Sequence, residues 1–268
     1  MLELKNVSKI FNISGNKEDE RIALDHLNLT IEDGEFVTVI GGNGSGKTTT
    51  LNIIAGTIDQ DEGDVILDGI NLNNMKEFQR AKYFGRVFQN PSMGTAGDMS
   101  ILENLEMALL RGQKHSPFRW GFKKSHKEIF IEELKKFDLG LEDRLSQKVN
   151  LLSGGQRQAL TLLMASIVKP RVLLLDEHTA ALDPKTADKV LKTTDRIVKD
   201  HKLTTIMITH NMKDAIKYGN RLIMMSNGHI VVDIKGEEKE KLTVEQLLKM
   251  FNVASQDDVL PDSVVLGN

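Results

Sequence analysis

A short glycine-rich stretch, GGNGSGKT at 41–48, carries the residue types needed to hold a phosphate group. It matches the pattern G-x-x-x-x-G-K-[ST], in which glycines let backbone N–H groups close around phosphate oxygens. Lys47 would neutralise the terminal phosphates of a nucleotide, and the Thr48 hydroxyl would bind Mg²⁺. The alternative is a flexible turn with a surface lysine. The apolar run before the loop and the helical pattern after it favour nucleotide binding instead.

Two adjacent carboxylates, Asp176 and Glu177, end the apolar segment VLLLDE at 172–177. Asp176 would hold Mg²⁺ through its water shell, and Glu177 would take the proton of an attacking water. A positioned general base contributes about 10²–10⁴ in rate. The alternative is an acidic pair that caps the following helix. This interpretation is the weaker one, because the same chain also contains a phosphate loop.

A second glycine pair lies in LLSGGQRQAL at 151–160, where it follows a serine and opens a helical pattern. Helix N-termini bind anions, so this segment predicts a second phosphate contact. It has no lysine, unlike the first loop. One nucleotide needs only one such loop, so the second must have another task.

Four further residues are weak signals when taken singly. Gln89 ends a strand pattern and His210 follows one, and either could be purely structural. Asp183 precedes Pro184 and could simply cap a helix. Phe11 lies in an alternating strand, where the default expectation is a core residue.

The elements that position these residues alternate between short apolar strands and amphipathic helices, which predicts an α/β fold. A strand at 36–40 leads into the phosphate loop, and a helix follows it to Gly56. Asn227-Gly228 predicts a hairpin turn. Further strands are expected within 2–11, 22–31, 63–72, 83–91, 172–177, 204–210 and 221–234, and further helices within 101–110, 127–137, 157–168, 187–201 and 243–251.

Together and in this order, the motifs resemble those of ATP-binding cassette (ABC) nucleotide-binding subunits, importer type, over about the first 235 residues. LSGGQ at 152–156, shortly before VLLLDE, is that family's hallmark. The resemblance implies a P-loop NTPase (RecA-like) α/β core with a mostly parallel sheet, an N-terminal antiparallel β subdomain and an inserted helical subdomain. The cassette would span 1–235, with its core at 1–91 and 169–235 and its helical subdomain at 92–168. A short helical tail would follow at 236–268.

The resemblance also implies roles for single residues. Phe11 would stack on adenine, Gln89 would reach Mg²⁺ and the attacking water, and His210 would contact the γ-phosphate. The second loop would bind the ATP of a partner subunit, which explains why the chain has two loops. ATP would contact Phe11, Gly41, Gly42, Asn43, Gly44, Ser45, Gly46, Lys47, Thr48 and Thr49; the partner's ATP would contact Ser153, Gly154, Gly155, Gln156 and Asp183; Mg²⁺ would be held by Thr48, Gln89 and Asp176.

Composition narrows the function further. No apolar run is long enough to span a membrane, so a membrane role requires partner chains. The absence of cysteine excludes thiolate zinc sites, and the net charge of −3 predicts no general attraction to nucleic acid. The resemblance to ABC subunits implies a peripheral subunit on the cytoplasmic face of the plasma membrane. It would form a homodimer or a paired cassette, bind permease subunits and work with an extracytoplasmic solute-binding protein of an amino-acid uptake system. An exporter subunit remains the alternative, with a non-transport ABC ATPase less favoured.

Two features depart from the expected pattern. His178 follows Glu177, where the family usually has proline, and is either a pH-sensitive neighbour of the site or a tolerated substitution. The segment 111–127 holds six Lys/Arg residues and no acidic residue. It is either a solvated loop or a surface for the membrane or permease.

Overall fold

The computed structural model describes residues 1–12, 20–112 and 124–254, so most of the basic segment at 111–127 and the acidic end of the chain lie outside the described residues. The described chain divides into two compact units. One combines 1–80 with the chain from Thr204 onward, and the other comprises 81–203. The functional division predicted at residues 92, 169 and 236 remains a prediction.

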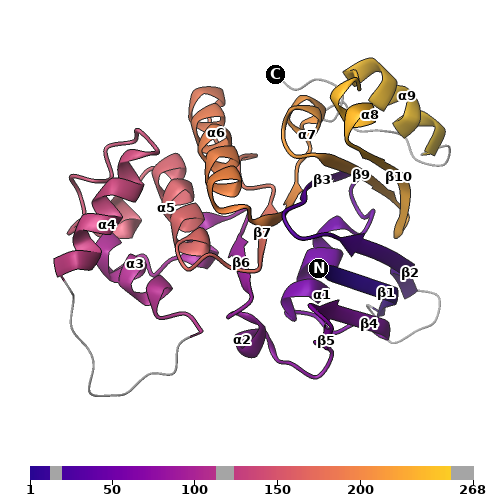
Figure 1. Ribbon diagram of the computed structural model, residues 1–268, viewed down its shortest axis with the longest axis horizontal. Helices are drawn as coiled ribbons and strands as arrows, with labels where there is room; N and C mark the ends of the chain where they lie inside the picture. The colour runs from indigo at the N-terminus through magenta and orange to yellow at the C-terminus, as the bar shows by residue number, and fades with distance from the viewer. Residues whose placement is uncertain (13–19, 113–123, 255–268) are drawn as a thin grey trace. The chain divides into compact units, whose positions relative to one another are not determined.

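The first unit contains two groups of strands (Figure 1). The strands β1 (Leu2–Asn12), β2 (Glu20–Ile31), β4 (Glu62–Leu67) and β5 (Ile70–Asn71) form an antiparallel sheet in the order β2-β1-β4-β5. The neighbouring strands β10-β9-β3-β8 are β10 (His229–Lys235), β9 (Arg221–Ser226), β3 (Phe36–Gly41) and β8 (Thr204–Ile208). Strand β3 is parallel to β8 and β9, and β10 is antiparallel to β9. The predicted antiparallel N-terminal part and mostly parallel core are thus confirmed.

The two longer helices of the first unit match the helical segments expected up to Gly56 and within 243–251. Helix α1 (Lys47–Ala55) begins at the phosphate loop and ends at Gly56, whose φ of 79° is the left-handed conformation typical of glycine after a helix. Helix α9 (Val244–Ala254) buries Leu247 and Phe251 in the same apolar cluster as residues of α7 (Met212–Lys217) and β9. The first part of the predicted tail is therefore part of this unit's core. The short helices α2 (Glu77–Arg80), α7 and α8 (Glu237–Glu240) were not expected from the sequence.

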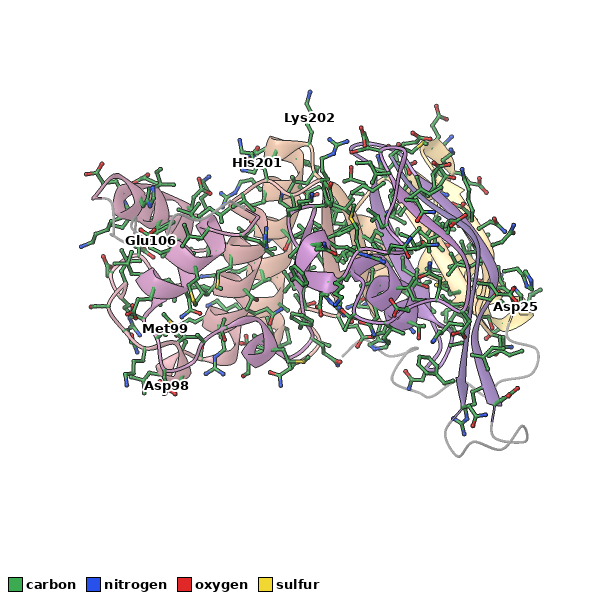
Figure 2. All side chains as sticks on the ribbon, turned by 90° about the horizontal axis from the view of Figure 1, so that it is seen from below. Asp25, Asp98, Met99, Glu106, His201 and Lys202 are labelled. Atoms are coloured by element: carbon green, nitrogen blue, oxygen red, sulfur yellow. The ribbon has the colours of Figure 1, made fainter. Side chains whose placement is uncertain are left out.

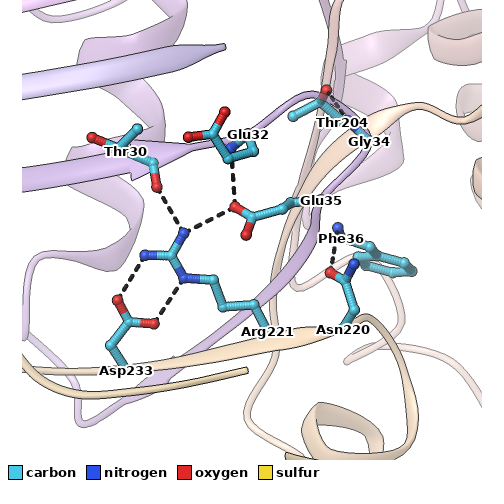
Figure 3. A network of polar contacts seen from close by, with 9 residues as sticks. All are labelled: Thr30, Glu32, Gly34, Glu35, Phe36, Thr204, Asn220, Arg221 and Asp233. Atoms are coloured by element: carbon cyan, nitrogen blue, oxygen red, sulfur yellow. Dashed lines mark hydrogen bonds and ion pairs between the residues drawn. The ribbon is translucent and has the colours of Figure 1, made fainter. Parts of the chain in front are cut away.

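Arg221 ties several backbone segments of this unit together (Figure 3). Its Nε and Nη2 donate to the two oxygens of Asp233 at 2.7 and 2.6 Å, and its Nη1 donates to Thr30 O at 2.7 Å and to Glu35 Oε2 at 2.9 Å. The hydrogen bonds to Asp233 raise the pKa of Arg221 above its ordinary value. This one guanidinium joins β9 and β10 to the end of β2 and to the turn before β3. It therefore holds the N-terminal end of β3, the strand that leads into the phosphate loop.

The second unit pairs two parallel strands, β6 (Phe84–Val87) and β7 (Val172–Asp176), with four longer helices (Figure 1). These helices are α3 (Ile101–Leu109), α4 (Lys124–Lys135), α5 (Gly154–Ser166) and α6 (Pro184–His201). Short 3₁₀ helices lie at Pro91–Gly94 and Val149–Leu151. Helix α5 packs against β6, α3, α4 and α6, and a side chain at Gly85 on β6 would lie 2.2 Å from Ala165 O of this helix. All five residues of β7 are buried, which explains its apolar sequence.

Two helix ends in this unit match their sequence signals. Asp183 caps α6 by accepting from Thr186 N at 3.0 Å, and Pro184 occupies the first turn. At the other end, His201 is the last helical residue and Lys202 takes a left-handed φ of 50° (Figure 2). The expected strand at 83–91 is shorter than its pattern, because pairing with β7 ends at Val87.

Candidate nucleotide-binding site

The phosphate loop joins β3 to α1 in the first unit, as its pattern requires. Two glycines are sterically necessary here. A Cβ at Gly41 would lie 2.3 Å from Met225 O, and one at Gly46, whose φ is 100°, would lie 2.6 Å from Ala23 O. The backbone therefore runs too close to its neighbours for any side chain at these positions. At Gly42 and Gly44, in contrast, nothing lies within 4 Å of an added Cβ, so this part of the loop faces open space.

The Lys47 side chain lies within the loop. Its Nζ donates to Gly41 O at 2.9 Å and to Gly42 O at 2.7 Å. Thr48 is exposed in the first turn of α1, and the capping residue of that helix gives no side-chain hydrogen bond to its N–H groups. An uncapped N-terminus with a lysine beside it suits a phosphate group. Asn43 is exposed, Ser45 is buried and Thr49 is half-buried.

Phe11 on β1 does not belong to the core, so the default expectation for this residue is wrong. It is 37% exposed, and the Lys9 Nζ lies 5.6 Å from the centroid of its ring. The Lys9 Nζ is itself paired with Asp61 Oδ1 at 2.8 Å. An aromatic ring with an open face fits the predicted stacking on a base.

His210 lies in the same unit, in the short connection between β8 and α7, and is half-buried. The residue after it, Asn211, caps α7 by accepting from the N–H groups of Lys213 and Asp214. His210 is thus held between a buried strand and a capped helix, at the carboxyl end of a strand next to β3.

Asp176 and Glu177 lie in the second unit, at the carboxyl end of β7. Asp176 is 7% exposed, and Glu177 is half-buried. Glu177 has a φ of 45°, the left-handed conformation that a non-glycine residue adopts at a cost of about 1–3 kcal/mol. Its carbonyl accepts from Ala180 N at 3.0 Å. Such backbone strain is typical of functional positions, which favours a chemical role over the helix cap, and α6 is in fact capped by Asp183.

The donor set suits Mg²⁺. Among the described residues, no group of three or more His, Cys, Asp or Glu side chains is arranged to hold a metal. Mg²⁺ does not need such a cage, because it usually binds one or two carboxylates together with substrate phosphates and water. A buried carboxylate at Asp176 and an exposed hydroxyl at Thr48 are ligands of this hard-oxygen type.

Gln89 follows β6 and is exposed. The residue before it is fixed from two sides. Gln158 on α5, which is 1% exposed, donates from Nε2 to Phe88 O at 3.2 Å, and the Arg86 guanidinium lies 4.5 Å from the Phe88 ring centroid. Gln89 therefore extends from an anchored position.

The second glycine loop is a helix N-terminus, as predicted. Ser153 and Gln156 form a capping box at the start of α5: Ser153 Oγ accepts from Gln156 N, and Gln156 Oε1 accepts from Ser153 N. Ser153 and Gly154 are exposed, whereas Gly155 is buried. A Cβ at Gly155 would lie 2.1 Å from the Thr186 methyl carbon. The backbone N–H of Thr186 in turn donates to the capping side chain of Asp183. The structure thus brings the second loop and Asp183 together within one unit.

His178 is 2% exposed, and its Nε2 lies 3.3 Å from Thr194 Oγ1 on α6. Burial lowers the pKa of His178 to about 4. The imidazole is therefore neutral at neutral pH, which argues against the pH-sensitive interpretation and for a packed polar residue that ties the segment after Glu177 to α6.

Sequence reasoning missed three polar residues, the half-buried Arg86 and the buried Gln158 and Lys239. Arg86 lies 3.9 Å from Asp176, Gln158 holds Phe88, and the Lys239 Nζ donates to Ile216 O, Tyr218 O and Gly219 O at 2.8, 2.6 and 3.0 Å. The one signal for Arg86 was a charge within an apolar strand. Lys239 gave no signal, because it stands among charged residues in KGEEKEK.

Comparison with known proteins agrees with these motifs. Residues 24–180 match the family model described as ABC transporter. The chain is 47% identical to a tyrosine transport ATP-binding protein of Clostridioides difficile, over 95% of this chain and 100% of the relative. It is 36% identical to the spermidine/putrescine import ATP-binding protein PotA of Haemophilus ducreyi, over 94% of this chain and 65% of that protein.

A solved relative shares the fold. It is a dimeric ATP-binding cassette in a post-hydrolysis state with ADP and Pi, with a TM-score of 0.75 and 31% identity, covering 88% of this chain and 98% of that one. No described helix of the present chain is long and apolar enough to cross a membrane. The chain belongs to the ABC transporter family and is an ATP-binding, ATP-hydrolysing subunit of a membrane transporter.

Proposed function

We propose that this chain powers uptake of a small solute, an amino acid of the tyrosine type, through separate permease subunits. The observation that carries this proposal is 47% identity to a tyrosine transport ATP-binding protein over the whole length of that relative. The chain would act at the cytoplasmic face of the plasma membrane and receive solute from an extracytoplasmic binding protein.

ATP would be held chiefly by the first unit. Phe11 would stack on the base, and the N–H groups of 41–49 with Lys47 would hold the phosphates. The open surface at Gly42 and Gly44 and the uncapped N-terminus of α1 support this assignment. The Lys47 Nζ donates to the carbonyl oxygens of Gly41 and Gly42, so a phosphate would replace these neutral acceptors with a charged one.

The second unit would supply the hydrolytic groups. Asp176 and Gln89, together with Thr48 from the first unit, would hold Mg²⁺. The metal neutralises phosphate charge when bound. Glu177 would accept the proton of the attacking water, and His210 of the first unit would contact the γ-phosphate. The strained backbone at Glu177 and the anchored position before Gln89 support these roles.

The second loop would act on the ATP of a partner subunit. Ser153, Gly154, Gly155, Gln156 and Asp183 would form this contact. Exposure of Ser153 and Asp183, and the dimeric state of a cassette 31% identical to this chain, support the arrangement. Each subunit would then form half of two sites, which explains two phosphate-binding loops in one chain.

A transport assay tests the proposal. The chain is reconstituted with its permease in vesicles, and uptake of labelled tyrosine is measured with spermidine and putrescine as competitors. We expect ATP-dependent uptake that unlabelled tyrosine suppresses and the polyamines do not. Uptake blocked only by the polyamines would overturn the amino-acid assignment, and ATP-dependent extrusion would favour the exporter alternative.

The catalytic assignment needs a separate variant. Glu177→Gln removes the base but keeps the shape, so ATP hydrolysis should fall at least about 100-fold while ATP binding persists and the ATP-bound dimer accumulates. Glu237→Gln is the control, because the Glu237 side chain is 88% exposed on α8. Hydrolysis by the Glu177 variant within a few fold of the parent would show that another group is the base.

A further inference from the structure

Arg86 lies between Asp176 and the residue that precedes Gln89. Strands β6 and β7 run side by side in parallel, and Arg86 pairs in register with Leu174. From this position its Nη2 lies 3.9 Å from Asp176 Oδ2, with the two side chains only 12% and 10% exposed. The same guanidinium lies 4.5 Å from the ring centroid of Phe88.

The geometry is that of a charge pair rather than a strong hydrogen bond. Charge-assisted N–H···O contacts are about 2.7–2.9 Å long, and a bidentate fork has two of them. At 3.9 Å, Arg86 reduces the electrostatic cost of a buried carboxylate without forming such a fork. Arg86 thus places a positive charge beside the buried carboxylate without a short hydrogen bond at this contact.

The guanidinium is also restrained on its other side. It faces the Phe88 ring, and the backbone of Phe88 is fixed by Gln158 from α5. Cation–π contact between a guanidinium and an aromatic ring is favourable, and more so where the pair is largely desolvated. The contact with Phe88 therefore favours the position of Arg86 beside Asp176, also when nucleotide and metal bind.

We propose that Arg86 is the resident counter-ion of Asp176 and makes divalent-metal binding at this carboxylate depend on nucleotide. Mg²⁺ and a guanidinium are like charges that compete for one carboxylate. Without nucleotide, Asp176 is already neutralised and attracts the metal weakly. The phosphates of ATP add the negative charge needed for both cations to be accommodated, so the metal enters with the nucleotide and not before it. This inference rests on the proposed role of Asp176.

The test measures metal binding to nucleotide-free protein, with Mn²⁺ as the probe and the loss of its free-ion EPR signal as the readout. Arg86→Met removes the charge and keeps an apolar chain against Phe88, whereas Arg86→Lys keeps the charge. We expect Arg86→Met to bind Mn²⁺ at least about ten-fold more tightly than the parent, Arg86→Lys to resemble the parent, and the gain to vanish in Arg86→Met with Asp176→Asn. The Mg²⁺ concentration for half-maximal ATP binding should fall about ten-fold in Arg86→Met as well.

The outcomes distinguish the counter-ion role of Arg86 from the metal-binding role of Asp176. If Arg86→Met binds Mn²⁺ no better than the parent, or if Arg86→Lys gains as much as Arg86→Met, the counter-ion role is wrong. If Asp176→Asn alone leaves the Mg²⁺ dependence of ATP binding unchanged, the proposed metal role of Asp176 fails instead. Thermal unfolding checks that the variants are folded. Arg86→Gln, which is neutral but can hydrogen-bond Asp176, replaces Arg86→Met if that variant does not fold, with the same expected gain.

Discussion

Replacing the exposed aromatic ring of Phe11 should weaken nucleotide binding far more than it weakens the fold. The ring is 37% exposed and has Lys9 as its cationic neighbour, so it is not part of a closed core. Base–aromatic stacking contributes about 1–3 kcal/mol per base by alanine substitution. Since 1.4 kcal/mol corresponds to ten-fold, the ATP Kd of Phe11→Ala should rise about 5- to 150-fold. Loss of stability should be about 1 kcal/mol, below the 3–5 kcal/mol typical of a fully buried phenylalanine.

Binding calorimetry and urea unfolding on four variants separate stacking from packing. Phe11→Tyr keeps a ring and should bind ATP like the parent. Phe11→Leu keeps apolar volume and should fold normally but bind as weakly as Phe11→Ala. Ile22→Ala, on the neighbouring strand and 58% exposed, is the matched control and should change neither property. The reasoning is refuted if Phe11→Leu binds ATP as tightly as the parent.

Three further predictions concern stability. Arg221→Met should lower the free energy of unfolding by about 3–5 kcal/mol, because two carboxylates lose their cation; a urea-unfolding change below 1 kcal/mol would contradict this. Burial lowers the pKa of Lys239 from 10.5 to about 8, so the unfolded chain binds that proton more readily than the folded chain does. The free energy of unfolding should therefore rise from pH 8 to pH 10, by about 1.4 kcal/mol per pH unit at most. Lys239→Met should lose this rise, and an identical slope of unfolding free energy against pH in both proteins would refute the prediction. Gly155→Ala should lower the free energy of unfolding, measured by thermal unfolding, by about 1–3 kcal/mol, because its Cβ would meet Thr186 at 2.1 Å. Gly154→Ala, whose Cβ would lie 3.8 Å from its nearest neighbour, should lower it by less than about 0.5 kcal/mol. Equal losses would show that the contact at Gly155 relaxes freely.

Local sequence signals predicted most of the fold. Apolar runs such as 36–40 and 172–176 are buried strands, and Gly56, Asp183 and Asn227-Gly228 end or begin elements where their backbone preferences require. The short helices α2, α7 and α8 were not predicted, because four to six residues are too few to show a helical period. Strand β6 was predicted too long because its end depends on pairing with β7, which no local pattern reveals.

The candidate site was predictable where motif spacing carries chemistry, and not where tertiary contacts do. The phosphate loop, Asp176, Glu177 and the second glycine loop stand at the expected ends of strands and helices. The left-handed backbone of Glu177 has no local sequence signal, and the burial of His178 depends on its contact with Thr194 of α6, which no local pattern reveals. The Arg86–Asp176 pair arises only when two strands far apart in the chain lie side by side.

The central claim is that the second glycine loop acts on a partner's ATP, and a mixed dimer tests it directly. Lys47→Ala damages the phosphate loop and Ser153→Arg damages the second loop, so each homodimer has two damaged sites. In the mixed dimer, exchange of loops leaves one site with both defects and one site intact. The readout is occluded ATP per mixed dimer, because turnover can be silenced by coupling between the sites. We predict an occupancy of about one ATP per mixed dimer, from the one intact site. Occupancy no higher than in either homodimer would contradict the exchange of loops and the claim that the working protein is a dimer.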